Sequence, residues 1–262
     1  GGFIQLTGEV GTGKTTLVRS LLAREPSGVD IALVLNPRVT VPEFLLTLCE
    51  ELGISMPGSA SGSVKALVDA LSAHLLAAHA AGRRVAVIID EAHLLERDVL
   101  EQVRLLTNLE TSTRKLLQVI LIGQPELREL LAREDLRQVA QRITGRHHLE
   151  PLSREETAAY VRHRLRVAGA TREIFMPAAL RELHRRSGGL PRLVNVIADR
   201  ALLGAFARDR HEVSSGLLRA AAAEVAGEAD GSRVWPWVAT VATVLLVAVS
   251  VWWAWSQRTM GG

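Results

Sequence analysis

This sequence has a single cysteine and a small net charge. Cys49 is the only cysteine among 262 residues, which excludes an internal disulfide framework and any zinc or iron–sulfur site built from several cysteines. Such usage is typical of a reducing compartment. The 31 lysines and arginines nearly balance the 28 aspartates and glutamates, and no five like charges stand together. A dedicated nucleic-acid-binding protein is therefore not indicated.

Aromatic side chains are also few, and the tryptophans among them gather near the C-terminus, all within Trp235–Trp255. Residues 234–257 carry no charge, and Arg233 and Arg258 bracket them. This stretch exceeds the roughly 20 residues that a helix needs to cross a bilayer, and tryptophans near both of its ends suit the two membrane interfaces. The sequence therefore predicts one transmembrane helix over 234–257, and the neighbouring arginines weakly favour a cytoplasmic N-terminal side.

The rest of the chain is apolar enough to form a core, since 48% of all residues are hydrophobic. Four short, mostly β-branched runs bounded by Gly, Pro or Asp are typical of strands buried on both faces, and helical patterns separate them. This alternation predicts an α/β fold with a parallel sheet covered by helices. The expected strands are Phe3–Leu6, Ile31–Leu35, Val85–Ile89 and Leu116–Ile122, with Arg146–Leu149 as a candidate fifth.

The pattern changes to helices only after Pro151, beginning with a capping box formed by Ser153 and Glu156. Because the chain begins at Gly1 and a strand-like run already starts at Phe3, we expect an upstream segment in the complete protein. The expected organisation is a core over 1–150, a helical subdomain over 151–225, a linker over 226–233, a membrane helix over 234–257 and a tail over 258–262.

A phosphate-binding loop pattern follows the first expected strand. The segment Gly8-Glu-Val-Gly-Thr-Gly-Lys14-Thr15 matches the P-loop. In that motif the glycines let backbone N–H groups turn toward phosphates and the following helix presents its positive N-terminus. Lys14 is expected to reach the β- and γ-phosphates, and the Thr15 hydroxyl to bind magnesium. The expected ligands are ATP and Mg²⁺, and the expected binding residues are Gly8, Glu9, Val10, Gly11, Thr12, Gly13, Lys14, Thr15 and Thr16.

Two acidic residues follow the third expected strand. Asp90 and Glu91 come directly after Val85–Ile89, at the carboxyl edge where ligands of open α/β sheets bind. We expect Asp90 to hold the magnesium shell together with Thr15, and Glu91 to act as the general base toward the attacking water. His93 stands close enough in sequence to tune this pair, whereas no pattern among the eight histidines predicts a zinc site.

Gln124 and several arginines complete the candidate site. Gln124 follows the fourth expected strand, so its amide is expected beside the γ-phosphate or the attacking water; a helix-capping loop residue is the alternative. Phosphoryl transfer commonly uses an arginine from a neighbouring subunit, and four arginines cluster around the last expected strand. For each of them a solvated surface position is the alternative. They are Arg133, Arg137, Arg142 and Arg146.

Taken together, these features resemble the AAA+ ATPases, because a P-loop, an acidic pair and a sheet core are joined to a helical lid that carries Gly189-Leu-Pro-Arg192. Three further segments look like the general secretion pathway A (ExeA-type) family: Val103–Glu110, Leu117–Leu127 and Leu136–Ile143. The resemblance implies a P-loop AAA+ core with an all-helical lid. It further implies a sensor role for Gln124, an arginine finger acting in trans at Arg142 and a lid sensor at Arg192.

The leading functional hypothesis is an ATPase of the bacterial inner membrane, with its N-terminal catalytic part in the cytoplasm, that assembles or remodels a secretion or pilus complex. Its expected partners are further copies of itself in a ring or dimer, an inner-membrane secretion protein and the lipid bilayer. Members of the family typically continue into a periplasmic peptidoglycan-binding region, whereas only Ser256–Gly262 follow Trp255 here.

Two alternatives stay open. One is a nucleotide-dependent switch or scaffold with slow hydrolysis. The other is a DNA-associated AAA+ regulator of the transposition type, which the sequence disfavours because it shows no winged-helix segment after the lid and no basic tail.

Overall fold

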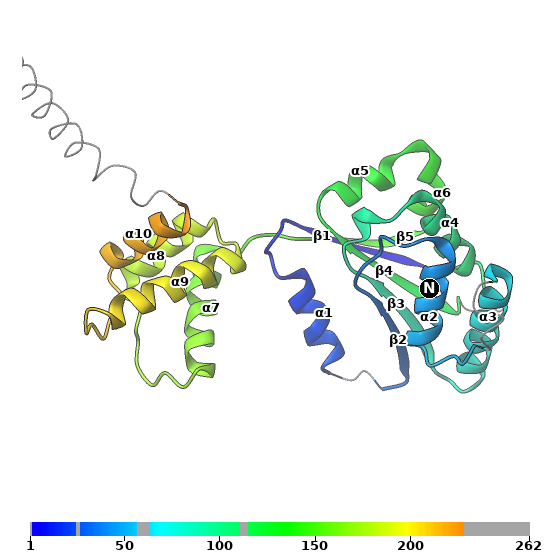
Figure 1. Ribbon diagram of the computed structural model, residues 1–262, viewed down its shortest axis with the longest axis horizontal. Coiled ribbons are helices and arrows are strands. Elements are labelled where there is room, and N and C mark those ends of the chain that lie inside the picture. The colour runs from blue at the N-terminus through cyan, green and yellow to red at the C-terminus, as the bar shows by residue number, and fades with distance from the viewer. Residues whose placement is uncertain (1, 25–26, 57–62, 111–114, 228–262) are drawn as a thin grey trace, which may run out of the picture. The chain divides into compact units, whose positions relative to one another are not determined.

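The chain divides into two units in the structure, a computed structural model that describes residues 2–24, 27–56, 63–110 and 115–227. The first unit runs to Leu152 and includes Leu190–Arg192, and the second holds Ser153–Gly189 and the described residues from Leu193 to Gly227. Figure 1 labels the helices and strands of both units.

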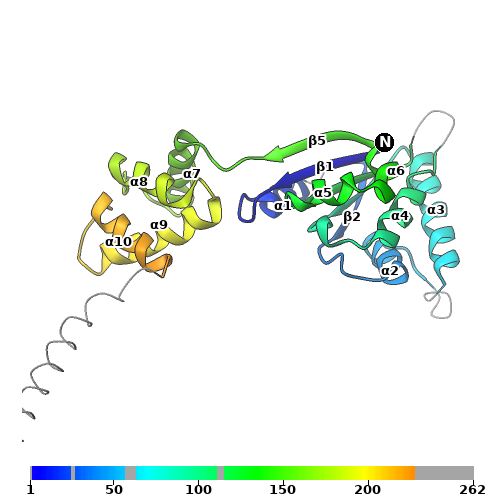
Figure 2. The ribbon, with the colours of Figure 1, turned by 90° about the horizontal axis from the view of Figure 1, so that it is seen from above.

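A five-stranded sheet forms the centre of the first unit. Its strands lie in the order β2-β3-β4-β1-β5, and every neighbouring pair is parallel. β1 is therefore flanked by β4 and β5, and Figure 2 shows β1 and β5 side by side. The predicted parallel α/β sheet is confirmed. The strands are β1 (Phe3–Gly8), β2 (Val29–Val34), β3 (Arg84–Ile89), β4 (Leu117–Gly123) and β5 (Ile143–Leu149).

The fifth strand is longer than the run expected from sequence. It begins at Ile143 rather than Arg146, and the Thr144 hydroxyl donates to the Phe3 carbonyl at 3.2 Å. β5 is an edge strand whose residues are exposed or half-buried along its whole length. An edge strand needs no continuous apolar run, which is why the hydrophobic pattern detected only part of it.

The helices of the first unit cover the two faces of the sheet unequally. Phe3 of β1 belongs to the large core that the sheet forms with α2 to α6. The other face packs against α1, where Val18 meets Ile88 and Ile122 in a smaller cluster. These helices are α1 (Lys14–Leu22), α2 (Val41–Glu51), α3 (Val64–Ala80), α4 (Arg97–Leu106), α5 (Glu126–Ala132) and α6 (Arg137–Ala140), with short 3₁₀ turns at Ala92–Leu94 and Glu134–Leu136.

In the described part of the second unit the regular secondary structure is helical, apart from one isolated β-bridge between Phe175 and Val213. α7 begins with the predicted capping box: the Glu156 backbone N–H donates to Ser153 Oγ at 3.2 Å, and the Ser153 N–H donates to Glu156 Oε2 at 2.8 Å. Gly188 ends the next helix in the left-handed conformation that glycine favours. The helices are α7 (Arg154–Val167), α8 (Pro177–Ser187), α9 (Pro191–Phe206) and α10 (Ser215–Val225), and the first two residues of α9 are grouped with the first unit.

These four helices share an apolar core of their own, which includes Val161, Leu183, Val194 and Leu218. On the surface of α8, hydrogen bonds from Arg185 and Arg186 lower the pKa of Glu182 to about 2. Glu182 is therefore ionised at neutral pH and holds two cations of the last turn, where positive charge also suits the helix dipole.

The predicted membrane span over 234–257 lies outside the described residues. Among the helices in the described ranges, none combines the length and the apolar character that crossing a bilayer requires.

Candidate functional site

The loop between β1 and α1 has the backbone of a phosphate cradle. Gly11 and Gly13 adopt φ values of 86° and 99°, a left-handed conformation that costs glycine little and most other residues more. Gly13 also stands at the N-cap of α1. The first free N–H groups and the positive dipole end of this helix therefore face the loop, and together they favour an anion.

Gly8 is packed too closely to tolerate a side chain. A Cβ at this position would lie 2.8 Å from the Leu149 carbonyl oxygen and 2.9 Å from Thr12 Oγ1. The end of β5 therefore fixes the entrance of the phosphate loop, and the absence of a side chain at residue 8 is a steric requirement.

Gly8→Ala is expected to weaken ADP binding and to destabilise the first unit by about 1–3 kcal/mol, the usual cost of overpacking. Gly145→Ala is the matched control, because a Cβ there would meet its nearest neighbour at an ordinary 3.7 Å. Thermal unfolding and ADP titration of both variants test this expectation. Equal effects of the two substitutions would contradict it.

Lys14 is a buried cation at the mouth of the loop, with 6% of its surface exposed. Its Nζ donates to the carbonyl oxygens of Gly8 at 2.7 Å and Glu9 at 2.9 Å. Within the described ranges, no carboxylate forms an ion pair with it. A buried ammonium balanced only by neutral carbonyls favours an anionic ligand, so the cradle fits a phosphate group.

Thr15 and Asp90 meet across the end of the sheet. The Thr15 hydroxyl donates to Asp90 Oδ2 at 2.7 Å, and the Glu91 backbone N–H donates to Asp90 Oδ1 at 2.9 Å. Asp90 is 3% exposed. A hydroxyl and a carboxylate beside a phosphate cradle are oxygen donors of the kind that Mg²⁺ takes when a substrate phosphate supplies the rest of its shell. The donor set therefore fits magnesium.

Glu91 carries two local irregularities. Its φ of 51° places a non-glycine residue in the left-handed region, at a cost of about 1–2 kcal/mol. Its Oε2 is buried without a hydrogen bond, although His93 Nδ1 lies 3.4 Å away within ion-pair range. Strained backbone and an unsatisfied carboxylate oxygen are features that cluster at functional sites.

His93 links the ends of β3 and β4, a contact that the sequence pattern did not reveal. The Gln124 backbone N–H lies 3.5 Å from His93 Nδ1, and a Cβ on Gly123 would come within 3.2 Å of the His93 backbone nitrogen. His93 therefore brings the loops that carry Glu91 and Gln124 together. The only sequence signal for it was its place two positions after Glu91.

Arg142 lies at the opposite edge of the sheet from the phosphate loop. It directly precedes β5, its carbonyl oxygen accepts from the Phe3 N–H at 3.1 Å, and Nη1 donates to Thr107 Oγ1 at 3.1 Å. All strands are parallel, so Arg142 stands at their amino ends, whereas Gly8 stands at a carboxyl end. The structure therefore does not bring Arg142 together with Lys14 and Asp90 in one chain. Arg192 is the exposed second residue of α9.

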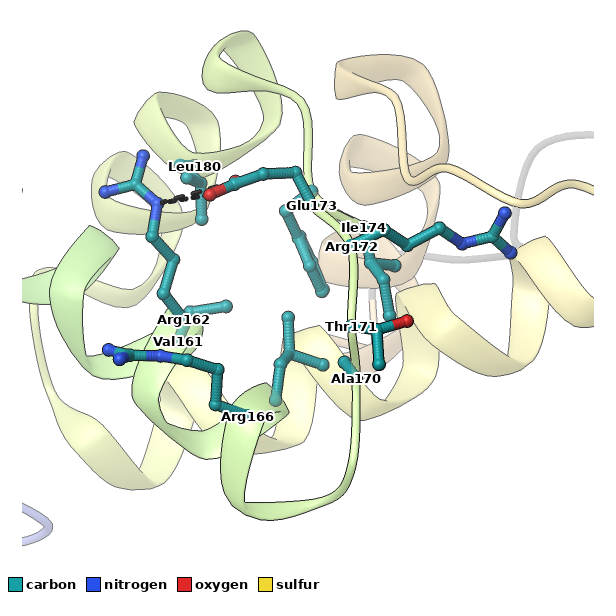
Figure 3. A pocket seen from close by; sticks show the side chains of 11 residues that line it. Val161, Arg162, Arg166, Ala170, Thr171, Arg172, Glu173, Ile174 and Leu180 are labelled. Atoms are coloured by element: carbon teal, nitrogen blue, oxygen red, sulfur yellow. Dashed lines mark hydrogen bonds and ion pairs between the residues drawn. The ribbon is translucent and has the colours of Figure 1, made fainter.

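A separate pocket of about 330 Å³ lies in the helical unit between α7 and the segment that leads into α8 (Figure 3). Arg162, Arg166 and Arg172 stand around an apolar lining that includes Val161 and Leu180. This pocket contains no residue of the phosphate loop or of the acidic pair.

The fold and the loop define the class: the chain is a P-loop ATPase of the AAA+ type. A family model described as AAA domain matches residues 1–131, and the chain belongs to that family. The predicted kinship with the general secretion pathway A type is also confirmed. The chain is 52% identical over 256 residues to general secretion pathway protein A of Aeromonas hydrophila, a match that covers 97% of this chain and 46% of the relative. It thus spans about half the length of that protein.

Solved structures support the fold. The ORC2 protein of Aeropyrum pernix matches with a TM-score of 0.63 at 20% identity, over 85% of this chain and 62% of that one. The Cdc6p protein of Pyrobaculum aerophilum matches with a TM-score of 0.67 at 18% identity, over 85% and 60%. The branch-migration motor RuvB of Thermotoga maritima matches with a TM-score of 0.53 at 15% identity, over 86% and 61%. At such identities the likeness extends to the fold alone.

Proposed function

We propose that this chain is part of a membrane-anchored ATPase that hydrolyses ATP to assemble or remodel a secretion or pilus complex of the bacterial envelope. The main support for ATP hydrolysis is that the buried Lys14 ammonium and the Thr15–Asp90 hydrogen bond lie at the same end of the sheet. The 52% identity to a general secretion pathway protein supports the envelope role.

Each part of the proposed site has its own role toward ATP. The loop from Gly8 to Thr16 binds the phosphates through backbone N–H groups and the Lys14 ammonium. Thr15 and Asp90 would hold magnesium, which would neutralise phosphate charge. Glu91 accepts the proton of the attacking water, and Gln124 orients that water or the γ-phosphate. The Glu91 carboxylate is suited to this work because one of its oxygens makes no hydrogen bond.

The trans arginine is proposed to be Arg142. Its place at the amino edge of the sheet keeps it from the nucleotide of its own chain, so a second copy would have to receive it. The site is then completed only in a ring or dimer, with Arg192 of the lid as a further contact to the γ-phosphate.

Mixing two inactive variants tests this shared site. Arg142→Ala and Glu91→Gln chains are each expected to hydrolyse ATP at least tenfold more slowly than wild type, because one loses the transition-state cation and the other the base. Their equimolar mixture is expected to regain activity. In a mixed assembly, the intact Arg142 of a Glu91→Gln chain can reach the site of a neighbouring Arg142→Ala chain, which has an intact Glu91. Arg137→Ala, which alters an exposed arginine nearby in the chain, is the control with normal activity. A mixture as inactive as its components would contradict Arg142 as the trans residue.

Membrane anchoring rests on the uncharged sequence over 234–257. The full chain is expected to stay with bacterial membranes through alkaline carbonate washing, because a spanning helix is held by hydrophobic burial and not by charge. A chain shortened after Gly227 is the matched control and is expected to wash off. Release of the full chain by carbonate would overturn the anchor.

A further inference from the structure

A basic pocket lies on the first unit beside β1, β5 and α5. Its volume is about 510 Å³, within the range of small-molecule sites. No residue assigned above to ATP or magnesium lines it. We call it the β1–β5 pocket. Its polar lining residues are Gln5, Thr7, Arg128, Arg146, His147 and His148.

The charge in this pocket is unbalanced. No acidic residue lines it, and across the described ranges no carboxylate pairs with Arg128 or Arg146. Glu150 lies nearby, with its Oε1 3.7 Å from His148 Nε2, but its side chain is 76% exposed. Two guanidinium groups in a concave surface without a counter-charge attract an anion, and their planar forks match phosphate or carboxylate oxygens.

A buried hydroxyl holds one of these arginines in place. Thr7 is 1% exposed, and its Oγ1 accepts from Arg128 Nε at 3.1 Å while lying 3.0 Å from His148 Nδ1. On β5, Arg146 Nη2 donates to the Ala140 carbonyl oxygen at 3.2 Å. The described hydrogen bonds thus use one nitrogen of each guanidinium, which leaves the others for a ligand.

Gln5 supplies an independent sign that the pocket is incomplete. It is 3% exposed, it lines the pocket, and its Nε2 is buried with no hydrogen-bond partner in the described structure. Buried amides are nearly always paired, so this donor calls for an acceptor. Leu131, Ala132 and Ala140 add an apolar part to the lining.

The pocket of Figure 3 differs from the β1–β5 pocket in its charge and in its buried polar groups. There the Arg162 guanidinium already has a counter-charge, since its Nε lies 3.2 Å from Glu173 Oε1. The described side chains of that pocket also leave no buried polar atom unpaired. The β1–β5 pocket is therefore the better candidate for an anion.

We propose that the β1–β5 pocket binds a small organic anion, with its phosphate or carboxylate group between Arg128 and Arg146 and its apolar remainder against Leu131 and Ala132. This site is separate from the phosphate loop, and its occupation requires no hydrolysis of ATP.

Titration of the ADP- and magnesium-saturated full chain tests the proposal, because ADP keeps the phosphate loop filled. The probes are inorganic phosphate and, in a second series, succinate, and the readout is the NMR signals of the arginine Nε–H groups and the histidine rings. Wild type is expected to show saturable shifts at Arg128 and His148. Arg128→Gln and Arg146→Gln are each expected to weaken binding at least tenfold. Tighter binding of phosphate than of succinate would point to a phosphorylated ligand, and the reverse order to a carboxylate.

Arg84→Gln is the matched control, because Arg84 is an exposed arginine of the same unit outside the pocket. Shifts that never saturate for either probe, or equal weakening in all three variants, would overturn the proposal. Thermal unfolding confirms that each variant is folded. ADP affinity, measured on the same samples, is expected to stay unchanged. Failure of wild type to bind ADP would count against the proposed ATPase site. The pocket is tested separately, by the difference in affinity for phosphate or succinate between Arg128→Gln and Arg84→Gln.

Discussion

Lys14→Ala is expected to abolish measurable nucleotide binding. The substitution removes the buried ammonium that now contacts the carbonyl oxygens of Gly8 and Glu9 and that is expected to turn to the phosphates when nucleotide enters. Hydrogen bonds to charged groups are worth about 1.5–3 kcal/mol each. Loss of two of them corresponds to at least about a hundredfold lower affinity. Isothermal titration with ATP or ADP measures this change.

Lys65→Ala is the control for this experiment, because Lys65 is an exposed lysine in the first turn of α3. Its affinity for nucleotide is expected to equal that of wild type. Thermal unfolding of Lys14→Ala without nucleotide shows whether the loop itself has collapsed. Retained ATP affinity in a folded Lys14→Ala chain would contradict the placement of the phosphates.

Glu91→Gln is expected to keep ATP binding and lose hydrolysis. Glutamine preserves the size of the side chain but cannot accept the proton of the attacking water, and general-base catalysis contributes about 10²–10⁴-fold to rate. ATP is expected to remain bound and intact, so assembled complexes accumulate. Single-turnover hydrolysis, measured together with ATP affinity, separates the two effects.

Glu96→Gln is the matched control, because Glu96 is an exposed acid at the N-cap of α4 whose side chain makes no capping hydrogen bond. It is expected to hydrolyse ATP at the normal rate. Normal turnover in Glu91→Gln would place the base on another residue. A wild-type chain that binds ATP but turns it over no faster than Glu91→Gln would favour the nucleotide-dependent switch.

The phosphate loop and the sheet are predictable from the sequence because their signals are local. Lys14 and Thr15 stand within one motif, and Asp90 follows a continuous apolar run, so parallel topology alone predicts that they meet. The 2.7 Å hydrogen bond from Thr15 to Asp90 bears out that geometry. Their roles in binding magnesium stay a prediction.

Other contacts between residues far apart in the chain could not be predicted from the sequence. Thr7 and Gln5 belong to the first strand, yet they share a pocket with Arg128 and Arg146 of a later helix and strand. No spacing rule connects such positions. The left-handed backbone of Glu91 could not be predicted for another reason, since glutamate does not favour that conformation. Only the surrounding structure imposes it.

A map of the chain bound to a non-hydrolysable ATP analogue and magnesium, by crystallography or electron cryo-microscopy, shows directly whether the phosphate loop binds the nucleotide and whether Glu91 lies beside it. We expect Lys14 Nζ to leave the carbonyl oxygens of Gly8 and Glu9 for the β- and γ-phosphates. We also expect Thr15 and Asp90 to flank the metal and Glu91 to face the γ-phosphate. Nucleotide bound away from the loop, or Glu91 turned from the γ-phosphate with the analogue in place, would contradict this expectation.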